Sequence, residues 1–73
     1  MNFTRHARNR MRQHSLGDAE VESLVWASAE RGTASDGKPI VFGVVRGQRY
    51  RVVYVVEDGN TTVISVHPRR TTQ

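Results

Sequence analysis

Apolar residues in the first part of the chain recur at helical spacing. Phe3, Ala7 and Met11 lie four residues apart and form one stripe, and Thr4 is a suitable N-cap, so we expect a helix over about residues 4–13. A second helix is expected over about residues 18–30, because acidic residues suit its positive N-terminal end and the apolar positions share one face. The acidic residues are Asp18, Glu20 and Glu22, and the expected buried face comprises Val21, Leu24, Val25 and Ser28.

The second half of the chain contains short apolar runs, rich in valine and tyrosine, that are typical of strands. Three strands are expected over about residues 40–45, 49–56 and 61–66, after a polar loop at 31–39 and before a basic tail at 68–73. Asp58 and Gly59 are a strong hairpin signal between the last two strands. We therefore expect one α+β domain over residues 1–73, with two N-terminal helices packed on a three- to four-stranded antiparallel sheet.

The pattern leaves open which face of the sheet the helices cover. With a plain two-residue turn, Arg51 pairs with Val66 and shares its face with a bulky apolar set. The other, open face then carries Tyr50, Tyr54, Ser65 and His67. A bulged turn slips the pairing by one residue and places Arg51 on the same face as Ser65 and His67. The apolar composition favours the first register.

The charge is positive and unevenly distributed. The net charge is +4, ten of the eleven cationic residues are arginine, and most of the acidic residues lie between positions 17 and 36. Arginine pairs bidentately with phosphate and carboxylate groups, so the excess favours a nucleic acid or an acidic protein as partner. The alternative explanation is a solvated basic surface with some acidic residues paired to it.

Composition narrows the compartment and the chemistry. The chain has no cysteine, no apolar run of about 18–20 residues and no apolar signal-peptide core at its start, so we expect a cytoplasmic protein. The three histidines, His6, His14 and His67, lack acidic or cysteine partners at ligand spacing, so we expect no metal and no other cofactor.

As residue types, His6, Arg51 and His67 are sufficient for RNA cleavage without a metal. A base removes the proton of a ribose 2′-OH, an arginine stabilises the charge that builds on the phosphorane, and an acid protonates the leaving 5′-oxygen. Histidine serves as acid or base near neutral pH. Each residue also has a structural explanation: His6 bonded to a backbone carbonyl, Arg51 in a salt bridge, and His67 exposed at a strand end.

Two segments resemble known families. Residues 3–11, which include His6, Ala7, Arg10 and Met11, are similar to the H-A-x-x-R-M start of a bacterial domain family of unknown function. Residues 49–58 resemble the Y-R-V-V-Y strand of RelE/ParE-type toxins. The resemblance extends from Phe3 to about residue 70 and implies the RelE-like fold of metal-independent microbial ribonucleases and toxins.

The resemblance also implies roles for individual residues. Arg51 matches the strand arginine that RelE-type nucleases place at the scissile phosphate, which favours the register with Arg51 on the open face. His6 matches an N-terminal histidine that is a candidate base. His67 lies roughly where some of these toxins keep a C-terminal histidine or tyrosine.

Two functions are therefore expected as alternatives. In a RelE-like toxin-type endoribonuclease, His6 is the base, Arg51 binds the phosphate, and His67 or Tyr54 is the acid or a base-stacking group. The expected RNA-binding residues are Arg10, Arg46, Arg49, Tyr50, Tyr54, Arg69 and Arg70. In a non-catalytic module, the open face binds nucleic acid or a protein, and the candidate partners are RNA and an acidic antitoxin-like protein.

Trp26 falls outside the expected buried face of the second helix. It either covers the loop that follows or anchors a protein partner, because tryptophan is enriched at the energetic centres of interfaces. A second copy of the chain is one such partner, and the domain would then be a self-associating structural protein.

Overall fold

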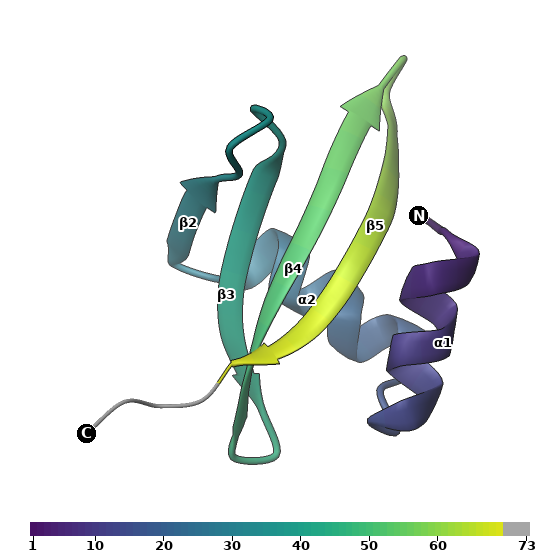
Figure 1. Ribbon diagram of the computed structural model, residues 1–73, viewed down its shortest axis with the longest axis vertical. Helices are drawn as coiled ribbons and strands as arrows, with labels where there is room; N and C mark the ends of the chain where they lie inside the picture. Colours follow the sequence, from purple (N-terminus) through teal and green to yellow (C-terminus); the bar gives the residue numbers. More distant parts are fainter. Residues whose placement is uncertain (70–73) are drawn as a thin grey trace.

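The computed structural model describes residues 1–69, which form two helices and a five-stranded mixed sheet (Figure 1). In chain order the elements are β1 (Asn2–Phe3), α1 (Arg5–Gln13), α2 (Asp18–Ala27), β2 (Glu30–Thr33), β3 (Pro39–Val45), β4 (Gln48–Glu57) and β5 (Asn60–Arg69). The strands lie in the order β1-β5-β4-β3-β2. Helix α2 lies behind the sheet in Figure 1, whereas α1 lies beside β5.

The α+β class with two N-terminal helices is confirmed, but the expected sheet was wrong in two respects. Two further strands are present, and the sheet is mixed because β1 pairs with β5 in parallel. Strand β2 pairs antiparallel with β3 and is exposed along its whole length, so its sequence lacks the alternation of apolar residues that predicts a strand. It also ends the helical segment earlier than expected, and β5 continues into the expected tail as far as Arg69. Within residues 1–69 neither helix is long and apolar enough to cross a membrane.

A β-bulge in β5 decides which side chains share a face of the sheet. From the turn onward the pairing of β4 with β5 is regular until Tyr54 lies opposite Val63. Val53 then lies opposite Ser65, which leaves Ile64 without a partner and shifts the register by one residue.

The bulge combines features of both expected registers. The turn itself is a plain two-residue hairpin, with Glu57 opposite Asn60, as in the first alternative. The slip then occurs inside the strand, so Arg51 lies opposite His67 and shares a face with Ser65, as in the second alternative. The first register, which the apolar composition favoured, was therefore wrong for the half of the hairpin that carries Arg51.

The helices cover the face of the sheet opposite to Arg51. The core on that face consists of Ala7, Met11, Leu16, Val21, Leu24, Val25, Val41, Tyr50, Val52, Val63 and Val66. Gly43 in β3 allows α2 to pack closely, because a Cβ atom there would lie 2.4 Å from a methyl carbon of Leu24. We call the other side the open face; on β3, β4 and β5 it carries Ile40, Phe42, Val44, Arg49, Arg51, Val53, Val55, Ser65, His67 and Arg69.

The bulge also fixes the start of α1. Thr4, the N-cap of α1, accepts a hydrogen bond from the backbone N–H of Ala7 at 3.1 Å, as its sequence position predicts. The same hydroxyl donates to the carbonyl oxygen of the bulged Ile64 at 2.7 Å, and the backbone N–H of Thr4 donates to the Val63 carbonyl at 3.0 Å. Helix α1 therefore begins on the irregular part of β5, and His6 follows two residues later.

Candidate active site

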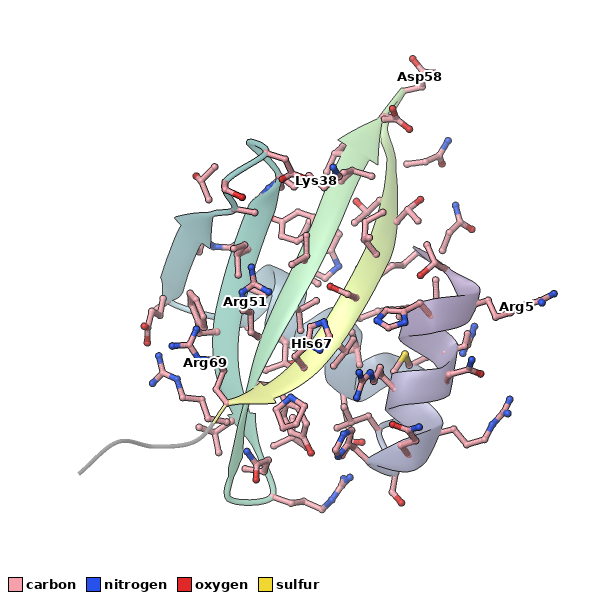
Figure 2. The ribbon with its side chains drawn as sticks, in the orientation of Figure 1. Arg5, Lys38, Arg51, Asp58, His67 and Arg69 are labelled. Atoms are coloured by element: carbon pink, nitrogen blue, oxygen red, sulfur yellow. The ribbon has the colours of Figure 1, made fainter. Side chains whose placement is uncertain are left out.

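His6, Arg10, Arg51 and His67 come together at the boundary between α1 and the open face, and we call them the His–Arg cluster. The rings of His6 and His67 lie 5.7 Å apart, centroid to centroid, and are tilted by 50°. Arg51 lies directly opposite His67 on the neighbouring strand. Figure 2 shows Arg51 and His67 on the side of the sheet away from α2. All four residues were singled out from the sequence.

Three elements position the cluster. Strand β4 supplies Arg51 and β5 supplies His67, and the bulge aligns the two in one row across the sheet. Helix α1 supplies His6 and Arg10 from one side, because residues four apart lie on the same helix face. The apolar stripe of Ala7 and Met11 is buried against the sheet, which turns the edge of that stripe toward β5.

The electrostatic environment favours the neutral form of His67. Partial burial lowers the pKa of His67 below its ordinary value of 6.5, and the positive charges of Arg10, His6 and Arg51 lower it further. A neutral imidazole has an unprotonated nitrogen near pH 7, and that nitrogen can accept a proton or a hydrogen bond.

Carboxylates do not neutralise this cluster. Within residues 1–69 the ion pairs join Arg8 to Asp18, Lys38 to Asp36, Arg46 to Glu20, and Arg49 to Glu30. None of them includes a member of the His–Arg cluster. Arg51 therefore forms no salt bridge within these residues, contrary to the structural explanation considered for it. Both arginines of the cluster are partly buried, so their charges are less screened than those of fully exposed residues.

Two of the arginines expected to bind RNA are instead engaged by the protein. Arg46, in the β3–β4 turn, pairs with Glu20 and donates to the backbone carbonyl oxygen of Ser15 at 2.5 Å. Arg49 pairs with Glu30 of β2 at 2.5 Å, although it lies on the open face. Arg46 therefore ties a turn to the start of α2, away from the His–Arg cluster.

The two tyrosines were wrongly expected on the open face. Tyr50 is only 4% exposed and belongs to the core, where its ring meets His14, the C-cap of α1, edge-on at 5.8 Å. Tyr54 also packs against the core, and its hydroxyl accepts a hydrogen bond from Arg31 at 3.0 Å. The bulge is the physical reason, because it brings both Val63 and Val66 of β5 onto the face of the even-numbered side chains of β4, and the helices cover that face. Neither ring is placed to stack on a base beside Arg51.

Arg69 and Phe42 are in contact on the open face, where Phe42 lies opposite Arg51. The guanidinium carbon of Arg69 lies 5.2 Å from the centre of the Phe42 ring, and that of Arg49 lies 5.5 Å from it. Phe42 was not predicted as a site residue; its alternation with Ile40 and Val44 was the available signal, and it was interpreted as core packing. Arg70, the remaining expected RNA-binding residue, lies outside the residues that the structure describes.

Trp26 lies on a different part of the surface from the His–Arg cluster. Its side chain is 63% exposed, and it lines a pocket of about 260 Å³ with Met1, Asn2, Glu22, Gly59, Asn60 and Thr61. This exposure agrees with the expectation that Trp26 is outside the buried face of α2. The pocket contains no member of the His–Arg cluster.

The arrangement provides the parts of a general acid–base site around a bound anion. Two imidazoles that face each other across a short gap can both contact one phosphate group, and the adjoining guanidinium groups supply bidentate donors for its oxygens. Over residues 1–69 no three histidine, cysteine, aspartate or glutamate side chains gather as candidate metal ligands.

Comparisons with protein families, with curated proteins and with solved structures find no match to this chain. The resemblance to the RelE/ParE-type toxins and to the H-A-x-x-R-M family therefore stays a prediction.

Proposed function

We propose that this protein is an endoribonuclease of the RelE-like toxin type that cleaves RNA without a metal ion. The observation that carries the proposal is the gathering of two histidines and two arginines where α1 meets the open sheet face, without an ion-pairing carboxylate within residues 1–69. An uncompensated cationic cluster of this kind is suited to a phosphodiester, and the histidines supply proton transfer near neutral pH.

The lowered pKa of His67 favours this residue as the general base. In its neutral form it removes the proton from the ribose 2′-OH, whose oxygen then attacks the adjacent phosphorus. His6, 5.7 Å away, donates a proton to the 5′-oxygen as the bond from phosphorus to that oxygen breaks. The products are a 2′,3′-cyclic phosphate and a free 5′-OH. This assignment reverses the sequence-based expectation, in which His6 was the base.

Arg51 and Arg10 stabilise the negative charge that grows on the phosphorane oxygens. Because this charge is greatest in the transition state, their contribution appears in the rate more than in substrate affinity. Removing one such preorganised donor typically lowers kcat by about 10²–10³-fold.

The test is cleavage of mixed RNA by the purified protein in the presence of a chelator, with and without ribosomes. We expect cyclic-phosphate ends, and we expect the Arg51→Ala variant to lose about 10²–10³-fold in rate with a much smaller change in affinity. Arg46→Ala is the matched control, because Arg46 is an arginine of the same hairpin but is paired with Glu20, away from the His–Arg cluster.

Two results would contradict this proposal. One is equal loss of rate and affinity in Arg51→Ala, which would indicate simple phosphate binding. The other is cleavage that survives replacement of both His6 and His67 by alanine, which would place the chemistry elsewhere.

The open face also supports a second candidate function, binding of an acidic protein segment. Beside the cations it carries the apolar side chains of Ile40, Phe42, Val44, Val53 and Val55. A mixed cationic and apolar surface is complementary to an amphipathic acidic segment. In this non-catalytic case the variant lacking both histidines still binds its partner, and the wild-type protein cleaves no RNA.

A further inference from the structure

An open hollow lies at the end of the sheet row that contains Arg51. It has a volume of about 400 Å³, within the range of about 300–1,000 Å³ that is typical of ligand sites. Its lining is mixed, with apolar side chains beside the polar groups of Ser23, Ser28, Glu30 and Arg49. The hollow is bounded by the end of α2 on one side and by Phe42 and Val44 of β3 on the other. Nothing in the resemblance or in the proposed chemistry accounts for it.

Phe42 connects this hollow to the His–Arg cluster. Glu30, Phe42, Arg51 and His67 lie opposite one another on four successive strands and so form one straight row. Adjacent strands are about 4.8 Å apart, so the backbone positions of Phe42 and His67 are separated by about 10 Å. A phosphate held at Arg51 therefore has His67 on one side and the Phe42 ring on the other.

The Phe42 ring is placed for contact with a ligand rather than for packing under the helices. It is only partly buried, and it is not part of the core that α1 and α2 form with the sheet. Arg49 and Arg69 lie within 5.5 Å and 5.2 Å of its centre. Aromatic rings and guanidinium planes are the two surfaces on which unpaired bases stack in proteins that bind single strands.

We propose that Phe42 and the hollow beside it bind one unpaired nucleobase of the RNA whose phosphate lies in the His–Arg cluster. This inference rests on the proposed function and deepens it, because it defines the substrate as single-stranded RNA. A base in a duplex is stacked between its neighbours and cannot enter the hollow without being unpaired. The hydroxyls of Ser23 and Ser28 are then available to the hydrogen-bonding edge of the base, beside the ion pair of Glu30 with Arg49.

The first experiment separates base binding from phosphate binding. Two probes share one 2′-O-methyl backbone, which cannot be cleaved through its 2′-oxygen: one carries bases and the other is abasic. The wild-type protein should bind the base-bearing strand at least about 5-fold more tightly, because one base–aromatic stack has about that effect. Phe42→Leu should abolish the difference, whereas Phe42→Tyr should keep it. Trp26→Leu, which removes an exposed aromatic ring elsewhere, is the matched control and should also keep it.

The second experiment detects the stack directly. Trp26 is the only tryptophan of the chain. In a Trp26→Phe protein that also carries Phe42→Trp, the single tryptophan reports from the hollow, and a base stacked on it should quench its fluorescence. We expect quenching by the single strand and none by the abasic strand or by a duplex of the same sequence.

These outcomes distinguish the base site from the proposed catalysis. A preference for the base-bearing strand that persists undiminished in Phe42→Leu, or equal binding of both probes by the wild-type protein, would overturn the base site even if unmodified RNA is cleaved. Quenching and Phe42-dependent binding without any cleavage would retain the base site and refute the ribonuclease.

Discussion

Replacing Gly43 with alanine tests how closely α2 packs on the sheet. The new Cβ atom would lie 2.4 Å from Cδ2 of Leu24 and 2.9 Å from Oγ of Ser28. Carbon atoms in favourable contact are about 3.5–4.0 Å apart, so the side chain of Leu24 must move by more than about 1 Å. Leu24 is 6% exposed and belongs to the core, so this movement disturbs its neighbours as well.

The expected cost is that of an overpacked core, about 1–3 kcal/mol. A domain of this size has a free energy of unfolding of roughly 4–11 kcal/mol, so the change removes a substantial part of it. For a domain of 60–100 residues each kcal/mol corresponds to about 4–8 °C, and the melting temperature should fall by about 4–24 °C. Urea denaturation followed by circular dichroism gives the same quantity independently through the transition midpoint.

Gly32→Ala is the matched control for this prediction. A Cβ atom at Gly32 would lie 3.8 Å from the Phe42 ring, which is an ordinary contact, so its stability should change little or rise slightly. The combination of Gly43→Ala with Leu24→Ala should cost less than the sum of the two single changes, because the smaller side chain removes the clash. Equal stability of the Gly43 and Gly32 variants, or strict additivity in the double variant, would refute the reasoning.

Two further predictions concern His67 and Arg46. An NMR titration should place the pKa of His67 below 6.5, and Arg10→Gln should raise that pKa; an unchanged pKa in this variant would contradict the charge effect. Because His67 binds protons more readily in the unfolded chain than in the folded protein, the stability of the wild-type protein should fall as pH decreases below 6.5. Arg46→Ala should lower the free energy of unfolding by at most about 1 kcal/mol, since the ion pair of Arg46 with Glu20 is exposed. The same variant should leave the salt dependence of RNA binding unchanged; a shallower dependence would mean that Arg46 contacts RNA.

The elements with strong local signals were predictable from the sequence. The stripe of Phe3, Ala7 and Met11, with Thr4 before it, predicted α1 to within a residue, because helical spacing and capping are local properties. Strands β1 and β2 escaped prediction for the opposite reason. The first is two residues long and the second is exposed throughout, so both exist through pairing with distant strands and not through their own composition.

The candidate site was predictable in its residues but not in its faces. His6, Arg10, Arg51 and His67 were all named from charge, residue type and resemblance, and they lie together. Both faces of β4 carry valines, however, so hydrophobicity did not indicate which face the helices cover. The unpaired Ile64 decided that question, and a single bulged residue has no reliable signature in one sequence. For the same reason Tyr50 and Tyr54 were misplaced.

The one extra residue of β5, Ile64, links the pairing of the hairpin to the position of α1. Deleting this one residue would join Val63 directly to Ser65, so the ladder would become regular while Arg51 still lay opposite His67. The same deletion would remove the carbonyl that receives the Thr4 hydroxyl. A loss of one codon would thus leave His67 beside Arg51 but remove a contact that positions the start of α1, and with it His6.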